Sequence, residues 1–393
     1  MPLAMAALRN IRHVLTLVVL AASVAVGPAG AEPFPAIVDY AVLMDDATGA
    51  ILFDKNGEQL TPPASMSKLM TLAVVFRALK DGQVKFDDEF TVSSYAYETG
   101  GDRSGTSSML LPQGSKVKLV DLLQGIIVQS GNDACIVVAE GISGSEEAFA
   151  GLMMEEARRI GLTDSVFVNS TGLPHPNHVM SARDIARLSH HLIGEYPEYY
   201  KSFAQRNYTY NNKLFVNRNP LLGMNIAADG LKTGFTEASG YGLAGSAIIG
   251  GRRSIVVING AKSQEQRASE ARKLLEWGFR NYKDAEIFPA DEIVGEARVW
   301  GGTLYYVPLV GDGPVRIMVP RATAQGRLKA NVVYKGPLKP PIKKGDRVAV
   351  LRVENSEGAI SEVPLLAGVD VDRAGVFARG LDSLLLLGLG WMM

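Results

Sequence analysis

The spacing of apolar residues changes along the chain, and these changes restrict the folds that it can adopt. Residues 40–56, "YAVLMDDATGAILFDKN", predict two strands joined by an Asp-Asp-Ala-Thr-Gly turn. Between residues 65 and 196 apolar residues recur at helical spacing, and two further strands are predicted at about 241–249 and 252–260. Strands at both ends with helices between them favour an antiparallel sheet with helices packed on it, which is an α/β (α+β) domain.

A different pattern begins at about residue 286. Short apolar runs such as "TLYYVPLV", "VRIMVP" and "RVAVLRV" are separated by Gly, Pro and charged residues, and no helical segment lies among them. Regular short strands of this kind predict a small all-β sandwich. We therefore expect a leader at 1–31, the α/β domain at 32–285, the sandwich at 286–370 and a tail at 371–393.

The first 31 residues have the features of a secretory signal peptide. Arg9 and Arg12 precede the apolar stretch 14–27, and the small residues Ala29 and Ala31 form a cleavage site. An uncleaved anchor is the alternative, but this apolar stretch is short for a span of about 20 residues. We expect cleavage after Ala31 and export of the mature chain.

The tail 371–393 has an amphipathic pattern. Val376, Phe377, Leu381 and Leu384 line one face of a predicted helix, and the last ten residues are apolar throughout. This stretch is too short to span a bilayer but suits the bilayer interface. A helix docked on the protein's own core is the alternative; we expect an anchor on a membrane surface.

The composition excludes several classes of site. The net charge of -1 gives no support for a nucleic-acid partner. Cys135 is the only cysteine, so a disulfide within the chain and a cysteine-rich zinc site are both excluded, and we expect its side chain to be small and buried. With five histidines and no His-Glu-x-x-His pattern, we predict neither a metal nor a cofactor.

Three short polar motifs occur in a fixed order: Ser65-Met-Ser-Lys68, Ser130-Gly131-Asn132 and Lys232-Thr233-Gly234. Taken singly, each has an ordinary explanation as a helix cap, a loop or the end of a strand. In this order they match the signature of serine penicillin-binding proteins and class A β-lactamases. The first motif opens a predicted helix, the second interrupts helical segments, and the third precedes a hairpin strand.

The residue types of the first motif suit nucleophilic catalysis. Ser65 at a helix N-terminus lies where backbone N–H groups favour developing negative charge. Lys68, one turn later, can accept the serine proton only when it is neutral, and burial or a second ammonium lowers a lysine pKa. Lys232 is the candidate for that second charge.

The other two motifs suit substrate binding and proton transfer. Ser130 can relay a proton to a leaving amine, and Asn132 can orient the peptide of a substrate. Lys232 and Thr233 can hold a carboxylate, and an extended strand can pair with the substrate backbone. The backbone N–H groups of Ser65 and Phe235 are the candidate oxyanion hole.

With these motifs, the chain resembles the low-molecular-mass penicillin-binding proteins that are D-alanyl-D-alanine carboxypeptidases. The likeness extends to "LLQGIIVQSGNDAC", "SARDIARL", "DGLKTGFTEASGYGLAGSA" and "EARKLLEWGF". It implies Ser65 as acyl-enzyme nucleophile, Lys68 as proton acceptor, Ser130 as catalytic relay and Lys232 as a substrate-binding residue. The implied substrate is a peptidoglycan stem peptide ending in D-Ala-D-Ala, and β-lactam antibiotics are implied to acylate the same serine. The implied location is the periplasmic face of the cytoplasmic (inner) membrane, with the C-terminal helix as anchor.

One residue departs from the family pattern, and two arginines extend it. Many relatives carry histidine after Lys-Thr-Gly, where this chain has Phe235, so the backbone donor is kept but an imidazole hydrogen bond is lost. Arg218 and Arg267 fall where relatives place arginines that could bind the substrate carboxylate. A surface or structural role is the alternative for both.

Three other functions remain open for the same motifs. A β-lactamase of class A would need a glutamate that activates the deacylating water, and no glutamate between the second and third motifs lies in a Glu-x-x-Leu-Asn loop; all fall in helical contexts (Glu146, Glu147, Glu155, Glu156, Glu195 and Glu198). A cell-wall binding protein without turnover should show a broken motif, and all three are intact. A D,D-endopeptidase could use the same chemistry.

Overall fold

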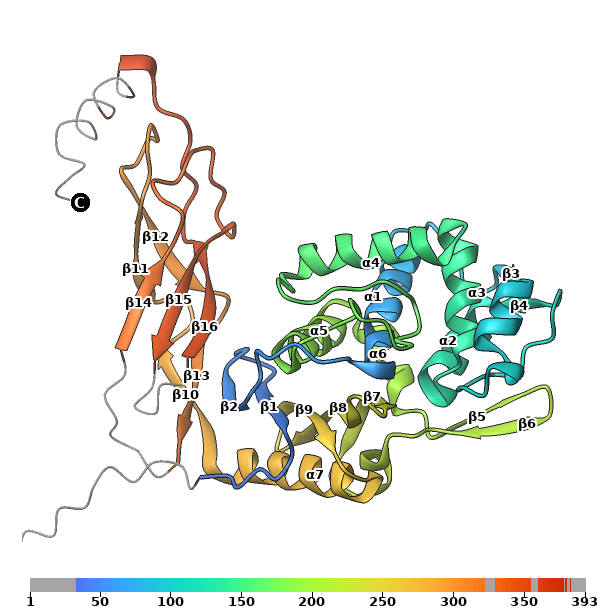
Figure 1. The fold of residues 1–393 in the computed structure, drawn as a ribbon. Helices are drawn as coiled ribbons and strands as arrows, with labels where there is room; N and C mark the ends of the chain where they lie inside the picture. The colour runs from blue at the N-terminus through green and yellow to red at the C-terminus, as the bar shows by residue number, and fades with distance from the viewer. Residues whose placement is uncertain (1–32, 322–328, 355–359, 378, 380–381, 383–393) are drawn as a thin grey trace, which may run out of the picture.

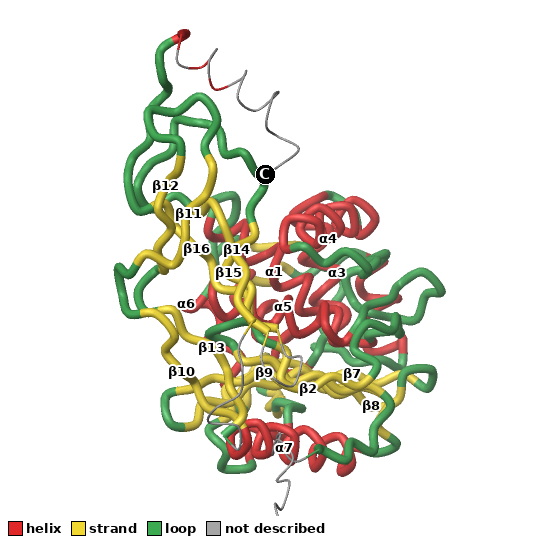
Figure 2. Tube along the Cα trace, turned by 90° about the vertical axis from the view of Figure 1, so that its left-hand side faces the viewer, coloured by secondary structure: helices red, strands yellow, loops and turns green. Residues whose placement is uncertain are grey.

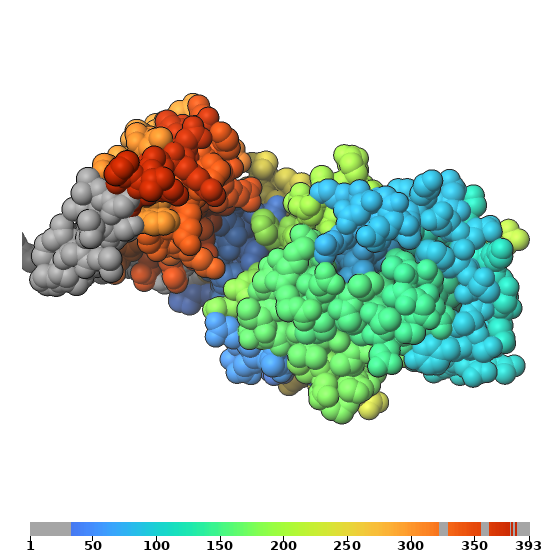
Figure 3. Space-filling model, turned by 90° about the horizontal axis from the view of Figure 1, so that it is seen from above, coloured from blue at the N-terminus to red at the C-terminus, as the bar shows by residue number. Residues whose placement is uncertain are grey.

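The computed structural model describes residues 33–321, 329–354, 360–377, 379 and 382. They form a large domain of sheet and helices and a smaller domain of strands, which lies beside it (Figure 1). Seen from above, the smaller domain is a separate lobe at one side of the larger one (Figure 3). The predicted order of an α/β (α+β) domain followed by an all-β domain is confirmed.

A five-stranded antiparallel sheet forms the centre of the large domain. Its strand order is β2-β1-β9-β8-β7, so segments from both ends of the domain are neighbours. Gly250 and Gly251, both at positive φ, join β8 to β9 in the predicted tight turn. The strands are β1 (Tyr40–Asp45), β2 (Ile51–Lys55), β7 (Ala228–Thr236), β8 (Gly240–Ile249) and β9 (Arg252–Ala261).

Helices cover both faces of this sheet (Figures 1 and 2). Leu43 and Val256 pack with Leu274 of the helix α7 on one face, whereas Val42 and Val257 belong to the core beneath the other helices. Neighbouring strand residues thus point to opposite faces, as the two-residue period of a strand requires. The helices are α1 (Lys68–Lys80), α2 (Leu119–Gln124), α3 (Asn132–Ser143), α4 (Glu146–Ile160), α5 (Ala182–Glu195), α6 (Pro197–Tyr200) and α7 (Gln264–Asn281), with 3-10 turns η1 (Ala64–Ser67), η3 (Asp102–Ser104), η5 (Lys201–Ala204) and η6 (Pro220–Gly223) and π-helical turns η2 (Ala96–Gly100) and η4 (Gly125–Gln129).

Three strand features differ from the prediction. The third motif precedes the hairpin of β8 and β9, as predicted, but itself lies inside the strand β7, which was not predicted because "ADGLKTGFT" is too polar and Gly-rich to be recognised as a strand by its apolar residues. Two small hairpins were also not predicted, since their strands are short or alternate only weakly. They are β3 (Glu89–Thr91) with β4 (Lys116–Lys118), and β5 (Asn207–Tyr210) with β6 (Lys213–Val216).

The smaller domain consists of two sheets around one core. β10 pairs with β13, and the other sheet has the order β11-β12-β16-β15-β14. Ile317 of β13 shares the core with Leu309 of β12, Leu351 of β15 and Leu365 of β16, which is the sandwich arrangement that was predicted. The strands are β10 (Tyr282–Phe288), β11 (Ile293–Arg298), β12 (Tyr306–Gly311), β13 (Val315–Pro320), β14 (Lys329–Val333), β15 (Arg347–Glu354) and β16 (Ile360–Ala367).

The two domains are joined without a linker. β10 begins at Tyr282, directly after α7, and the Tyr282 side chain is 3% exposed in the core of the large domain. Arg252 donates from Nη1 to the Tyr282 carbonyl at 2.6 Å, and Arg321 donates from Nε to the same carbonyl at 3.1 Å. The Arg252 bond fastens the start of the β domain to the large domain, and the Arg321 bond fastens it to the end of β13.

Both predicted targeting segments fall wholly or partly outside the described residues. The signal peptide at 1–31 does so completely. Of the tail, helical backbone is described from Val376, and residues 383–393 are outside. Within the described ranges, no helix combines the length and apolar character needed to cross a membrane.

Candidate active site

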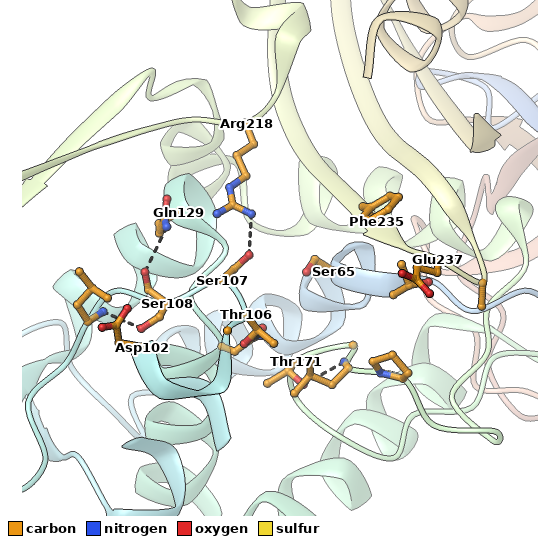
Figure 4. A pocket seen from close by; sticks show the side chains of 18 of the residues that line it. Ser65, Asp102, Thr106, Ser107, Ser108, Gln129, Thr171, Arg218, Phe235 and Glu237 are labelled. Atoms are coloured by element: carbon orange, nitrogen blue, oxygen red, sulfur yellow. Dashed lines mark hydrogen bonds between the residues drawn. The ribbon is translucent and has the colours of Figure 1, made fainter. Parts of the chain in front are cut away.

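A cavity of about 820 Å³ lies between the outer edge of β7 and the helical part of the domain (Figure 4). Ser65 lies in its wall together with Asn132, Thr171 and Phe235. A second cavity of about 420 Å³ also reaches Ser65 and is lined by the other motif and arginine residues, namely Ser130, Arg218, Thr233, Gly234 and Arg267. The structure therefore brings all three motifs to one place.

Ser65 and Lys68 are held at the start of the first long helix. Ser65 lies in the turn η1, and Lys68 is the first residue of α1. The preceding Ala64 has a φ of 49°, a conformation that is rare outside glycine and is found where surrounding structure imposes it. Gly234 of β7 permits this arrangement, because a Cβ there would lie 3.0 Å from the Pro63 carbonyl oxygen.

Lys68 has no solvent exposure and three close polar neighbours. Its Nζ lies 2.9 Å from Ser65 Oγ, 2.7 Å from Asn132 Oδ1 and 2.5 Å from the carbonyl oxygen of Thr171. Burial, with a smaller contribution from the Arg218 guanidinium, lowers the pKa of Lys68 to about 8. Roughly a tenth of Lys68 is therefore neutral at pH 7, and this neutral form is the one that can accept the Ser65 proton.

That Lys232 supplies a second charge acting on Lys68 stays a prediction. Among the cations around Lys68, Arg218 lowers its pKa. Lys232 is 2% exposed, and burial lowers its own pKa well below that of an ordinary lysine, with Lys68 and Arg218 adding to the effect. Lys68 and Lys232 are thus buried electrostatic neighbours.

Ser130 has an unusual backbone conformation and an unsatisfied hydroxyl. Its φ of 66° places it in the left-handed region, between η4 and α3. It is 2% exposed, and its Oγ has no hydrogen-bond partner in the described part of the chain. A buried hydroxyl without a partner is costly, and strain of this kind is typical of sites that bind a ligand.

Asn132 begins α3 and connects two sides of the site. Its Oδ1 accepts from Lys68, and its Nδ2 donates to Thr106 Oγ1 at 2.8 Å. The adjacent Asp133 accepts hydrogen bonds from Ser108 Oγ at 2.7 Å and from the Met109 N–H at 2.9 Å. The segment that forms the far wall of the cavity is thereby fixed to the second motif.

Two arginines reach the second cavity. Arg218 donates from Nη1 to Ser107 Oγ at 2.6 Å (Figure 4). Arg267 of α7 is 6% exposed, its guanidinium lies 5.7 Å from the Tyr241 ring centroid, and its Nε has no partner among the described residues. Burial lowers the pKa of both side chains from the usual arginine value. Neither the exposed Arg218 nor the buried Arg267 has a carboxylate partner among the described residues, and guanidinium groups of this kind suit an anionic ligand.

Phe235 forms part of the rim. Its ring is 51% exposed and stacks on Tyr241, with centroids 4.2 Å apart. It therefore offers an apolar face to a ligand where relatives offer an imidazole.

Several residues of the site were not predicted. The Thr171 carbonyl accepts from Lys68, and the surrounding turn is held by Asn169 Oδ1, which accepts from the N–H groups of Thr171 and Gly172. Asp133 and Ser107 were also missed. Asp133 follows the second motif directly, which is a signal that could have identified it; a backbone carbonyl such as that of Thr171 leaves no signal in the sequence.

Other side chains discussed above have structural surroundings. Cys135 is fully buried, as predicted, and burial raises its pKa to about 12. Both carboxylate oxygens of Glu146 accept hydrogen bonds, from Ser170 and from Tyr95. The described residues contain no group of three or more side chains that could hold a metal ion.

Comparison with known proteins identifies the family. A family model described as D-alanyl-D-alanine carboxypeptidase matches residues 31–263, and one described as the C-terminal domain of penicillin-binding protein 5 matches residues 282–373. The chain is 38% identical over 348 residues to D-alanyl-D-alanine carboxypeptidase DacC of Escherichia coli (strain K12), covering 88% of this chain and 87% of that protein.

Comparison with solved structures supports the same family. Penicillin binding protein 5 from Haemophilus influenzae superposes with a TM-score of 0.74 at 34% identity, covering 88% of this chain and 100% of that one. Penicillin-Binding Protein D2 from Listeria monocytogenes in a cefotaxime-bound form gives a TM-score of 0.55 at 27% identity, covering 63% and 100%. The match extends over both domains, so the chain belongs to the D-alanyl-D-alanine carboxypeptidase family of low-molecular-mass penicillin-binding proteins.

Proposed function

We propose that this protein is a serine D-Ala-D-Ala carboxypeptidase that removes the terminal D-Ala from peptidoglycan stem pentapeptides. The observation that carries the proposal is the position of Lys68, a fully buried amine 2.9 Å from the Ser65 hydroxyl. The other two neighbours of its Nζ, Asn132 Oδ1 and the Thr171 carbonyl, are hydrogen-bond acceptors only. A neutral amine that donates to both has its lone pair left for the proton of Ser65.

Acylation follows from this arrangement. Ser65 Oγ attacks the carbonyl carbon of the penultimate D-Ala while its proton passes to Lys68 Nζ. The backbone N–H groups of Ser65 and Phe235 are the donors for the oxyanion. As the C–N bond breaks, the leaving nitrogen takes a proton from Ser130 Oγ, and Ser130 regains one from the Lys68 ammonium. Free D-Ala and an ester on Ser65 result, with Lys68 neutral again.

Deacylation uses the same base. Water attacks the ester carbonyl and gives its proton to Lys68. The Ser65–acyl bond then breaks, and Ser65 Oγ takes the proton back from the Lys68 ammonium. The products are the shortened peptide and the free enzyme. No separate acid or base is needed, because Lys68 alternates between its two protonation states.

The basic groups of the second cavity suit the substrate terminus. The terminal D-Ala carboxylate is placed by Thr233 and by the two arginines, Arg218 and Arg267, which line that cavity with Ser65. Lys232 lies buried directly beneath, next in sequence to Thr233. The outer edge of β7 can pair with the extended peptide, and Asn132 can bind the substrate amide.

We propose further that β-lactams acylate Ser65. Support comes from the cefotaxime-bound relative, which shares the fold of the large domain. Glu146 is not available to activate water in the manner of a class A β-lactamase glutamate, because its two carboxylate oxygens accept hydrogen bonds from Ser170 and Tyr95.

The proposed location is the periplasmic face of the cytoplasmic membrane. It is supported by the signal-like leader 1–31 and by the amphipathic tail, which starts at an end of the β domain where Val376 and Phe377 are 73% and 97% exposed. Removing residues 376–393 keeps Val371 and its pairing with Ile342. This truncation should release the protein from membranes to the soluble fraction; retention on membranes would contradict the anchor.

An intact-mass time course with benzylpenicillin tests the proposed function. Wild-type protein should hold one lasting adduct that Ser65→Ala lacks, and a synthetic pentapeptide ending in D-Ala-D-Ala should lose one D-Ala. Fast loss of penicillin without an adduct would identify a β-lactamase. Cleavage of cross-linked dimers with no release from the pentapeptide would identify an endopeptidase, and no reaction with either reagent would identify an inactive binding protein.

A further inference from the structure

Glu146 lies outside the cavities but connects three segments near the catalytic lysine. It is the first residue of α4, and its Oε1 accepts from the N–H of Ser170 at 2.9 Å and from Ser170 Oγ at 2.6 Å. Its Oε2 accepts from the hydroxyl of Tyr95, just before η2, at 2.8 Å. Both oxygens are thus used, and the position at a helix N-terminus favours the charged carboxylate.

The segment that Glu146 holds is the one that contacts Lys68. Ser170 is fully buried, and its own carbonyl accepts from Thr71 Oγ1 at 2.6 Å. The next carbonyl along the chain, that of Thr171, accepts from Lys68 Nζ at 2.5 Å. Glu146 and Thr71 thus fix the peptide planes on the two sides of Ser170. The next plane holds the Thr171 carbonyl and the Gly172 N–H, which donates to Asn169 Oδ1 at 2.7 Å, so Glu146 sets where the turn that carries this carbonyl lies.

We infer that Glu146 is a positioning residue for the proposed acylation, acting through Ser170 and the Thr171 carbonyl to aim the Lys68 amine at Ser65. This inference rests on the proposed function, in which Lys68 is the base. Without the carboxylate, Ser170 loses two of its hydrogen bonds, and the turn that carries the Thr171 carbonyl can shift away from Lys68 as a unit, because only Asn169 within the turn still holds it. The amine then loses one of the two acceptors that orient its lone pair.

The charge of Glu146 also acts on Lys68. It is one of several charged or titratable groups around that lysine, which come from different elements: Cys135 and Asp133 from α3, Glu146 from α4, Lys232 from β7, and Arg218 and His178 from loops. The negative charge of Glu146 raises the pKa of Lys68, against the larger lowering by burial. Position and charge therefore have separable effects.

Two substitutions separate the positioning effect of Glu146 from the effect of its charge. Glu146→Gln keeps an oxygen for Ser170 but removes the charge, so its acylation plateau at high pH should stay within about twofold of wild type. The rise of its acylation rate constant with pH (the acid limb of the pH profile) should move to lower pH by about half a unit, since the charge that raised the Lys68 pKa is gone. Glu146→Ala also removes the acceptor, and its plateau should fall about tenfold, because small misplacements of a catalytic group are costly.

The measurement is the acylation rate constant of the full chain with a chromogenic cephalosporin between pH 5 and 10, corrected for active protein by penicillin titration. Glu147→Gln is the matched control: it is the neighbouring residue, is exposed, and should leave both plateau and limb unchanged. Tyr95→Phe removes only the bond to Oε2 and should lower the plateau by about twofold.

The outcomes distinguish the possibilities. If wild type acylates and both Glu146 variants match it in plateau and limb, the inference is wrong while the proposed function stands. If Glu146→Ala only loses thermal stability and its correctly folded fraction acylates normally, the residue is structural and the inference is also wrong. If wild type itself does not acylate, the proposed function fails first.

Discussion

The Nζ atom of Lys68 lies 2.9 Å from the Oγ atom of Ser65 in a site where the lysine has no exposed surface. The contact joins a residue that must lose a proton to a residue that must be able to accept one. Burial provides the second condition, since it lowers the pKa of Lys68 to about 8.

Acylation should therefore depend on pH through Lys68. Only the neutral amine accepts the Ser65 proton, so the rate rises with pH and reaches half its plateau near pH 8, the pKa of Lys68. Stopped-flow measurement of the second-order acylation constant with a β-lactam reports this pKa for the free enzyme. A rate constant that does not change between pH 6 and 9.5 would exclude Lys68 as the base.

The same pKa shift predicts a pH-dependent stability. The folded pKa lies below the unfolded value of 10.5, so between about 8 and 10.5 the unfolded chain binds more protons at this position, and stability rises with pH across that window. Relative to Lys68→Met, wild type should gain about 3 kcal/mol in free energy of unfolding from pH 7 to above 10.5. Urea unfolding of both proteins at several pH values measures the difference, which should be constant if burial does not disfavour the charge.

Ser130 should show a conflict between stability and activity. Both Ser130→Ala and Ser130→Gly remove the hydroxyl that we assign to the proton relay, so both should lower acylation at least about a hundredfold. Only glycine relieves the φ of 66°, and we expect Ser130→Gly to be about 1 kcal/mol more stable than Ser130→Ala. Equal melting temperatures of the two variants would mean that this backbone is not strained.

Arg267 should affect only substrates that end in a carboxylate. Its guanidinium is 6% exposed and has an unpartnered Nε within the described structure. Arg267→Ala should lower kcat/KM for a peptide ending in D-Ala-D-Ala by about ten- to a hundredfold, the value of one charge-assisted hydrogen bond. The same peptide as its C-terminal amide should react equally slowly with wild type and variant. Equal losses on acid and amide would instead indicate a structural arginine.

The parts of the site that could be predicted are those carried by local patterns. Ser65 with Lys68, and Ser130 with Asn132, are close in sequence and lie at helix boundaries that capping and glycine signals mark. Their convergence with Lys232 could be inferred only from the order of the motifs. The strand that carries Lys232 was missed, because its residues are chosen for a ligand and for close packing at Gly234 and not for an apolar face.

The contacts that tune the site could not be predicted. Lys68 meets the Thr171 carbonyl across 103 residues, and every residue type offers a carbonyl. Glu146 has the sequence context of any glutamate at a helix start, where the charge alone accounts for its presence. The pKa of Lys68 is likewise set mainly by its depth of burial, which no local pattern in the sequence reveals.

The buried Tyr282 at the start of β10 leaves no joint between the two domains. The β domain extends from that residue to the end at which the C-terminal segment leaves it (Figure 1). A β domain joined in this way holds both the distance and the orientation between its far end and the large domain. With the proposed membrane anchor at the far end, the β domain would set the height and the tilt of the catalytic cleft above that surface, and the enzyme would reach substrates at a fixed distance from it.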